Sequence, residues 1–286
     1  MISDILRLIR VKHWVKNGFV FVPLVFSKHL FNADYFTETI VAFFAFCFAS
    51  SIVYVINDIQ DVESDRAHTK KKSRPIASGR ISFKKAYAVI LLMIVLLGAV
   101  SLKLPENFHF ILTAYIVLNV AYTFILKKIV LLDLISIAAG FMLRVLGGAY
   151  AINVQVSTWL ILTTLFVSLF LAVMKRRSEI ESQGENATRE VLESYSIKFI
   201  DQISSITAAA VIICYALYSV SERTVQYFHT EYLVYTTIFV IYGIFRYLYL
   251  VHNMQKGEDT SEIIFSDLPT LINLVLYGAT VIYIVY

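Results

Sequence analysis

Charge is scarce in this sequence. Charged residues make up 16% of its 286 residues, whereas a soluble globular domain has about a quarter. Hydrophobic residues make up 58%, and the mean hydropathy is +0.70. This balance excludes a disordered chain and argues against an ordinary soluble domain, because too few charges remain to hydrate a surface. The composition is typical of a polytopic membrane protein.

Proline, glycine and cysteine are also few, with 4, 10 and 2 residues respectively. With so little proline and glycine we expect no flexible linker, and we predict that residues 1–286 form a single membrane domain. Cys47 and Cys214 both lie inside long apolar runs, so we interpret them as packing residues rather than as a disulfide or a metal site. The sequence also lacks a glycine-rich nucleotide loop, an HExxH motif and a CxxC pair.

Long apolar runs that end at charges predict about nine membrane-spanning helices, since a helix needs about 20 apolar residues to cross the hydrocarbon core. The predicted spans are residues 17–33, 36–56, 86–104, 108–126, 130–152, 157–174, 200–221, 231–251 and 269–286. Pro23 and Lys28 interrupt the first of them. The length of the runs favours helices over a β-barrel, whose strands are about ten residues long. We therefore predict an all-α integral membrane protein.

Residues 1–16 mix apolar and basic side chains, which predicts an amphipathic helix on an anionic membrane surface and no cleavable signal peptide. Most of the 25 lysines and arginines fall on the same side of the predicted spans as the N-terminus. By the positive-inside rule, we expect the N-terminus and the loops 57–85 and 175–198 on the cytoplasmic side of the cell membrane. Since the basic residues follow topology, the net charge of +4 does not indicate a nucleic-acid partner.

An acidic motif, Asn57-Asp58-x-x-Asp61-x-x-x-Asp65, follows the second predicted span. If the helix continues, its three aspartates lie within about 60° of arc on one face. Carboxylates are costly at the end of an apolar span, and a hard divalent cation such as Mg²⁺ is the usual reason to assemble them. A solvated helix end is the alternative interpretation.

A basic loop follows, from Lys70 to Arg80, and includes Lys71 and Arg74. Mg²⁺ held by carboxylates beside lysine and arginine suits a pyrophosphate group, because the metal bridges its oxygens and arginine neutralises the remaining charge. Positive-inside topology alone would account for the lysines, but it accounts poorly for the three aspartates.

Isolated polar residues in or beside the spans are further candidates. Arg144, in mid-span, is expected either to face a cavity or to pair with an acid of another span. Lys16 and Asn17 lie where a lipid phosphate would meet the surface, although interfacial anchoring explains them equally well. Tyr122 either lines a cavity or packs between helices.

The acidic motif, together with the sequence Arg74-Pro75-Ile76-Ala77-Ser78-Gly79, resembles the first aspartate-rich motif of the UbiA superfamily of intramembrane prenyltransferases. The resemblance implies nine helices around a central cavity, in agreement with the spans read from hydropathy. Members of that superfamily carry a second motif of the DxxxD kind after the sixth span. This chain has instead the basic stretch from Lys175 to Glu179.

That replacement is similar to the branch of the superfamily that contains decaprenyl-phosphate phosphoribosyltransferase. Other segments resemble the same branch: Trp14 to Asn17, Ser51 to Asn57, Leu132 to Arg144 and Gly257 to Asp267. The resemblance therefore extends over nearly the whole chain.

The resemblance implies an enzyme that transfers the 5-phosphoribosyl group from phosphoribosyl pyrophosphate to a polyprenyl phosphate and releases pyrophosphate in a Mg²⁺-dependent reaction. Asp58, Asp61 and Asp65 would hold the metal and act in catalysis. The expected substrate-binding residues are Lys16, Asn17, Asn57, Lys71, Arg74, Tyr122, Arg144, Lys175, Arg176 and Glu179. A helical ion pair with Lys175 is as good an explanation of Glu179 as substrate contact.

Two other functions are open. One is a prenyltransferase that joins a polyprenyl diphosphate to an aromatic acceptor, against which the missing second aspartate motif argues. The other is a transporter, which predicts charges at the middle of the membrane rather than at the cytoplasmic ends of spans. The sequence does not determine the length of the lipid acceptor or the oligomeric state.

Overall fold

The computed structural model describes residues 2–68, 71–183, 190–254 and 266–286. The regular structure in these residues is helical, with no strand among them. The chain divides into two compact units: unit 1 comprises Met1–Lys127 and Leu143–Gln155, and unit 2 comprises Lys128–Met142 and Val156–Tyr286. Helix α7 (Leu132–Ala151) therefore contributes its first half to unit 2 and its second half to unit 1.

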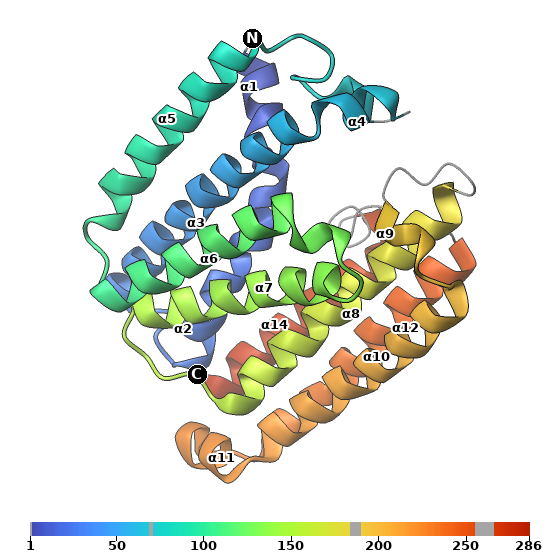
Figure 1. The fold of residues 1–286 in the computed structure, drawn as a ribbon. Helices are drawn as coiled ribbons and strands as arrows, with labels where there is room; N and C mark the ends of the chain where they lie inside the picture. Colours follow the sequence, from blue (N-terminus) through green and yellow to red (C-terminus); the bar gives the residue numbers. More distant parts are fainter. Residues whose placement is uncertain (1, 69–70, 184–189, 255–265) are drawn as a thin grey trace. The chain divides into compact units, whose positions relative to one another are not determined.

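Unit 1 is built around its longest helix, α3. In chain order, the elements of unit 1 are α1 (Ile2–Leu8), η1 (Val11–Phe21), α2 (Val22–Phe26), α3 (Ala33–Gln60), α4 (Val62–Ala67), η2 (Lys71–Ser73), α5 (Phe83–Ser101), α6 (Glu106–Phe124) and the second half of α7. α3 packs against α5, α6 and η1 (Figure 1). It starts where the Asn32 side chain accepts hydrogen bonds from the backbone N–H groups of Asp34 and Tyr35. No glycine or proline follows before its end at Gln60.

Close packing in unit 1 depends on aromatic rings and on glycine. The rings of Phe46 and Tyr115 meet edge to face with centroids 5.1 Å apart, and both side chains are buried. A Cβ added at Gly147 would lie 2.4 Å from the Phe46 ring, and one added at Gly148 would lie 2.1 Å from the carbonyl oxygen of Val20. The glycine pair of α7 therefore lets this helix approach α3 and η1.

Unit 2 contains the C-terminal helices. Its elements are the first half of α7, α8 (Thr158–Gln183), α9 (Glu190–Glu193), α10 (Ile197–Val220), α11 (Glu222–Phe228), η4 (Tyr232–Thr236), α12 (Thr237–Met254) and α14 (Leu268–Val285). A short 3-10 turn, η3 (Leu126–Lys128), lies at the boundary with unit 1. α10 packs against α8 and α12, and α12 packs against α14 (Figure 1). The core of unit 2 includes Phe170, Val211 and Leu250.

A paired arginine connects the last two helices of unit 2. Asp267 caps α14 by accepting a hydrogen bond from the Thr270 N–H at 3.0 Å. It also accepts two hydrogen bonds from the Arg246 guanidinium of α12, at 3.1 and 2.8 Å. These bonds hold the pKa of Asp267 well below its usual range. Arg246 therefore has a structural partner from a neighbouring helix.

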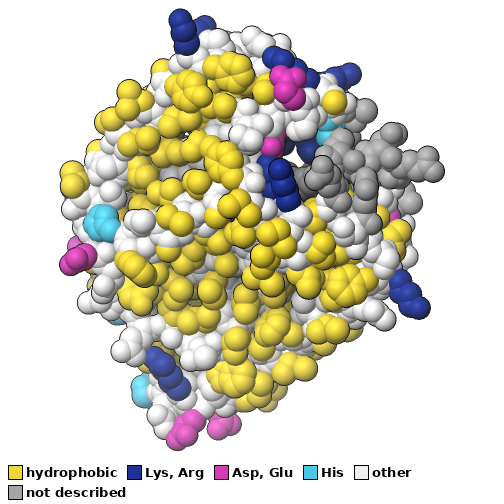
Figure 2. All heavy atoms as spheres, viewed as in Figure 1, with side chains coloured by type: hydrophobic (Ala, Val, Ile, Leu, Met, Phe, Trp, Pro, Cys, Tyr) yellow, Lys and Arg dark blue, Asp and Glu magenta, His cyan; other side chains and the backbone are white. Residues whose placement is uncertain are grey.

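Eight helices of the described residues are long and apolar enough to cross a membrane. They match eight of the nine predicted spans: Ala33–Gln60, Phe83–Ser101, Glu106–Phe124, Leu132–Ala151, Thr158–Glu181, Ile197–Val220, Tyr232–Asn253 and Leu268–Val285. Figure 2 shows apolar side chains over most of the face drawn, with charged side chains at only a few places. Large apolar residues such as Leu91 and Val95 are more than half exposed, as expected of helices that face hydrocarbon.

The first predicted span, residues 17–33, folds differently from the prediction. Residues 17–26 belong to the 3-10 helix η1 and the five-residue helix α2, which has Pro23 in its first turn, and residues 27–32 belong to no helix. Lys28 then adopts a left-handed conformation with a φ of 58°. Proline lacks an N–H to donate and a left-handed residue cannot continue an α-helix, so this apolar run does not form one regular helix.

The contact at Gly148 gives a stability prediction. Gly148→Ala would place a methyl group against the backbone of Val20, which cannot give way as a flexible side chain does. We expect the variant to lose about 1–3 kcal/mol of stability, as overpacked cores do. Thermal unfolding in detergent would measure the loss. Gly98→Ala on α5 is the matched control, since no atom lies within 4 Å of its added Cβ. Equal melting temperatures of the two variants would contradict the close approach.

Candidate functional site

The acidic motif lies where α3 ends. α3 stops at Gln60, Asp61 is its C-terminal cap and α4 starts at Val62. The motif is therefore broken at Asp61 instead of continuing as one helix, which corrects the expectation from the sequence. The backbone remains connected by hydrogen bonds, from the Asp61 N–H to the Asn57 carbonyl at 2.9 Å and from the Asp65 N–H to the Asp61 carbonyl at 2.8 Å.

Arg74 joins two of the three carboxylates. Its guanidinium lies 3.2 Å from Asp58 Oδ1 and 2.6 Å from Asp65 Oδ2. Both carboxylates are buried, whereas the Arg74 side chain is 26% exposed. Two buried carboxylates that share one guanidinium are brought together from helices on either side of the break at Asp61.

The loop after α4 positions Arg74. Pro75, Ile76 and Ala77 are buried, and the carbonyl of Ala77 accepts a hydrogen bond from Arg66 Nε of α4 at 3.3 Å. Gly79 completes the turn with a φ of +76°, a conformation that glycine adopts without strain. The motif Arg74 to Gly79 is thus a compact turn that directs its arginine toward the acidic residues.

Asp61 has different partners. Lys127 Nζ lies 2.7 Å from Asp61 Oδ1, and Asn57 Nδ2 donates a hydrogen bond to Asp61 Oδ2 at 2.9 Å. Both carboxylate oxygens are therefore occupied. The sequence placed Asn57 among the substrate-binding residues but gave Lys127 no role beyond topology.

Arg10 is a further partner that the sequence did not reveal. Its guanidinium forms an ion pair with Asp58 Oδ1 and lies over the Tyr54 ring, 4.7 Å from the centroid. Arg10 is left-handed, with φ 52° and ψ 50°, a conformation that costs an ordinary residue roughly 1–2 kcal/mol. Next to it, Ser51 Oγ donates to the Ile9 carbonyl at 2.9 Å. The N-terminal segment thus packs on α3 and turns at Arg10 to reach the acidic motif.

Burial changes the acidity of Asp65, one of the three carboxylates of the motif. Removal from water raises the pKa of Asp65, and the neighbouring Arg74 guanidinium partly opposes that rise. The Arg74 guanidinium therefore favours the charged form of Asp65. Lys71, a predicted binding residue, is half-buried and favours the charged form of Asp65 electrostatically.

The donor chemistry of the motif suits magnesium, because three carboxylates provide the hard oxygen ligands that this ion prefers. The arrangement of the three carboxylates, however, is not that of a metal site. Each carboxylate has a cationic partner, and the described part of the chain contains no group of three or more His, Cys, Asp or Glu side chains close enough to hold a metal ion. Binding Mg²⁺ here would require these ion pairs to rearrange.

Asn17 and Arg144 meet inside unit 1. Arg144 Nε donates to Asn17 Oδ1 at 2.7 Å, and its terminal nitrogen donates to Tyr115 Oη at 2.7 Å. The guanidinium also lies over the Tyr115 ring, 4.7 Å from the centroid. Asn17 donates in turn to Cys47 Sγ and Ser50 Oγ, at 3.2 and 3.3 Å. This buried polar network connects η1, α3, α6 and α7.

A second charged cluster belongs to unit 2. Arg176 is 1% exposed, and its Nε lies 2.8 Å from Oδ2 of Asp133, which is fully buried. Arg176 also pairs with Glu179. Tyr195 donates to the other oxygen of Asp133 at 2.7 Å, and burial raises the pKa of Tyr195. Lys175 is more open, 37% exposed and 3.9 Å from Glu179.

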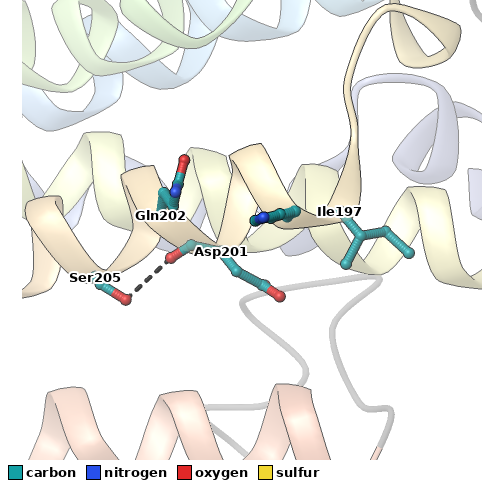
Figure 3. Close-up of a pocket in the computed structure, with 5 residues that line it drawn as sticks. Ile197, Asp201, Gln202 and Ser205 are labelled. Carbon is teal, nitrogen blue, oxygen red and sulfur yellow. Dashed lines mark hydrogen bonds between the residues drawn. The ribbon is translucent and has the colours of Figure 1, made fainter.

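The remaining predicted residues are more dispersed. Lys16 and Tyr122 are half-buried in η1 and α6. Residues 184–189 of the predicted loop 175–198 and Gly257 to Asp259 lie outside the described residues. A shallow pocket on α10 is lined by Ile197, Lys198, Asp201, Gln202 and Ser205 (Figure 3). Ile197 and Lys198 lie at the end of the predicted active-site loop 175–198, but none of the five was predicted as a catalytic or binding residue.

Comparisons with known proteins identify related sequences and folds. The family model described as the UbiA prenyltransferase family matches residues 20–267. A decaprenyl-phosphate phosphoribosyltransferase of Mycolicibacterium smegmatis is 34% identical over 228 residues, which cover 78% of this chain and 72% of the relative. One of Mycobacterium tuberculosis is 32% identical over 226 residues, covering 77% and 74%.

The fold has solved counterparts. A UbiA homolog from Archaeoglobus fulgidus, bound to GPP and Mg²⁺, superposes with a TM-score of 0.73 and 17% identity, and the match covers 99% of each chain. At that identity the likeness concerns the fold alone.

The buried pair in unit 2 gives a second stability prediction. Arg176→Gln would leave the Asp133 carboxylate buried with one cation fewer, which typically costs about 3–5 kcal/mol. Lys175→Gln is the adjacent control, and loss of its exposed pair should cost less than about 1 kcal/mol. Thermal unfolding of both variants in detergent would measure the difference.

A double variant tests whether Asp133 and Arg176 stabilise the fold by a direct interaction with each other. Asp133→Asn combined with Arg176→Gln should lose less stability than the sum of the two single variants, because each single change leaves a charge behind. Additive losses would contradict a direct coupling between the two side chains.

Proposed function

Since the chain belongs to the UbiA prenyltransferase family, we propose that it is a transferase that moves the 5-phosphoribosyl group of phosphoribosyl pyrophosphate to a polyprenyl phosphate and releases pyrophosphate. Together with the family, the eight long apolar helices found among the described residues indicate an integral multi-pass membrane protein. The observation that carries the proposal is a group of charged side chains that we call the acidic cluster. In it the carboxylates of Asp58, Asp61 and Asp65 pair with three cations, which are those of Arg10, Arg74 and Lys127. The phosphoribosyltransferase relatives support the choice of donor and acceptor.

The acidic cluster provides the groups that a pyrophosphate needs. Asp58, Asp61 and Asp65 would hold Mg²⁺, which when bound supplies positive charge to the oxygens of the leaving group. Arg74 and Lys71 lie beside these carboxylates, and they would bind the phosphate oxygens that remain. An arginine can contact two such oxygens at once through its planar fork of N–H donors.

The transfer itself asks little covalent chemistry of the protein. The bond between C1 of the ribose and the pyrophosphate oxygen breaks, and its electron pair leaves with pyrophosphate. An oxygen of the polyprenyl phosphate attacks C1 and forms the new bond. That oxygen is already ionised near neutral pH, so no strong general base is required. The protein contributes by positioning the two substrates and stabilising charge as the bond to pyrophosphate breaks.

In the second charged cluster, which belongs to unit 2, we propose that Lys175, the more exposed of its two cations, binds phosphate. Arg176 is buried between Asp133 and Glu179, so we assign it a positioning role for the end of α8. Asn57 orients Asp61 through its hydrogen bond.

The acceptor is assigned to residues of the N-terminal segment and α6. We propose that Lys16 and Tyr122, both half-buried, contact the polyprenyl phosphate. Asn17 and Arg144 hold each other by a buried hydrogen bond, and their proposed role is to position η1 against α7. The excess of lysine and arginine in the loops 57–85 and 175–198 supports a cytoplasmic location for the acidic cluster and the N-terminus.

Activity measurements on two aspartate variants would test the metal role. Asp58→Asn and Asp61→Asn keep the size of the side chain but remove its charge, so we expect turnover to fall by orders of magnitude while the protein remains folded. The assay follows ribose-labelled phosphoribosyl pyrophosphate into the organic phase, using purified protein in detergent with Mg²⁺ and a polyprenyl phosphate. Addition of a chelator should abolish the transfer.

Glu63→Gln is the matched control for these variants, because Glu63 lies on α4 in the same motif but its side chain is 83% exposed. We expect it to retain activity. Full activity in either aspartate variant would contradict the metal role. Failure of the ribosyl transfer, with a labelled prenyl diphosphate joined to an aromatic acid instead, would replace the proposed function with that of a prenyltransferase.

A further inference from the structure

The acidic cluster contains as many cations as carboxylates. Asp58 pairs with Arg10 and Arg74, and Asp65 pairs with Arg74. Asp61 pairs with Lys127. Within these ion pairs the three negative and three positive formal charges cancel, and Lys71 adds a further positive charge near Asp65. Arg10, Arg74 and Lys127 come from three separate places in unit 1, the start of η1, the turn after η2 and the 3-10 turn after α6.

This balance opposes the binding of a free divalent cation. A bare cluster of three carboxylates would attract Mg²⁺ strongly, but a neutralised cluster would gain two uncompensated positive charges. Four of the six carboxylate oxygens also have a hydrogen-bond partner. Asp61 uses both of its oxygens, one for Lys127 and one for Asn57, and Asp58 Oδ1 is shared by two guanidinium groups. Mg²⁺ alone would have to displace these cations and leave them partly buried without a counterion.

A pyrophosphate removes that obstacle. Its oxygens are strong acceptors for guanidinium and ammonium groups, so each displaced cation finds a new anionic partner. The added negative charge offsets the charge of the metal. The three cations are also suited to such a change, because they are long side chains and remain 17%, 26% and 14% exposed in the order Arg10, Arg74 and Lys127.

We propose that Arg10, Arg74 and Lys127 exchange their carboxylate partners for pyrophosphate oxygens when the donor binds, so that Mg²⁺ binds together with the pyrophosphate group and not before it. The proposal rests on the proposed function only in taking the acidic cluster as the pyrophosphate site. It adds Arg10 and Lys127 to the groups that bind the donor, and it gives the left-handed turn at Arg10 a purpose, since that turn brings the guanidinium to Asp58.

Calorimetric titrations of the purified protein in detergent would test the exchange. One titrant is MgCl₂ alone and the other is magnesium pyrophosphate. The wild type should bind magnesium pyrophosphate at least about tenfold more tightly than Mg²⁺ alone. Arg10→Gln should shift the two affinities in opposite directions. Mg²⁺ alone should bind more tightly, because Asp58 loses a competing cation, and magnesium pyrophosphate should bind about tenfold more weakly, because one charged hydrogen-bond donor is lost.

Opposite shifts distinguish exchange from damage to the fold, which would weaken both affinities. Arg7→Gln is the matched control, since Arg7 carries the same charge on the same segment and is exposed, and we expect neither affinity to change. Lys127→Gln should repeat the opposite shifts through Asp61, and it decides the matter if the Arg10 variant does not fold. The proposal is overturned if the wild type binds Mg²⁺ equally well with and without pyrophosphate, or if the folded variants shift both affinities in one direction.

The two proposals fail in different ways. A protein that shows the opposite shifts but does not transfer labelled ribose has the exchange without the proposed function. A protein that transfers ribose but binds Mg²⁺ alone as tightly as magnesium pyrophosphate has the proposed function, and the exchange is then wrong.

Discussion

A charged side chain that leaves water must be paired, and that constraint explains where the polar residues of this chain lie. At the end of α3 it gathers cations from three segments around three aspartates. In unit 2 it buries Arg176 against Asp133 and fixes Arg246 on Asp267. The constraint applies with special force beside a hydrocarbon phase, where water cannot substitute for a missing partner. Pairing therefore determines which helices must meet, and the apolar faces complete the packing around these contacts.

The same constraint relates structure to chemistry. An enzyme that binds pyrophosphate needs cations at its site, and partly buried cations are costly when no anion is bound beside them. In this chain the carboxylates that are proposed to hold the metal also neutralise the cations that are proposed to hold the phosphates. The carboxylates and cations of the acidic cluster would then form a single site, in which each group has one partner without substrate and another with it. By contrast, Arg176 is enclosed by acidic partners and is almost completely buried, which suits a permanent ion pair.

Much of the fold could be predicted from the sequence, because spans of apolar residues obey a length set by the membrane. Eight of the predicted spans have counterparts for that reason. The segment 17–33 does not, since a hydropathy average does not register what Pro23 and Lys28 do to a backbone. The acidic residues and Arg74 were predicted as neighbours, but the break at Asp61 was not. Partners remote in the sequence left no local pattern: Arg10 is 48 positions from Asp58, and Lys127 is 66 from Asp61. Their basic character was fully explained by topology, so the contacts emerged only from the folded chain.

The central claim is that the cations of the acidic cluster change partners when the metal and the pyrophosphate bind. The most direct measurement is an experimental structure of the purified protein with Mg²⁺ and inorganic pyrophosphate. We expect the carboxylates of Asp58 and Asp61 to face the metal, and the side chains of Arg10, Arg74 and Lys127 to lie within hydrogen-bonding distance of pyrophosphate oxygens. A structure in which both ligands are bound while all three cations keep their carboxylate partners would contradict the account.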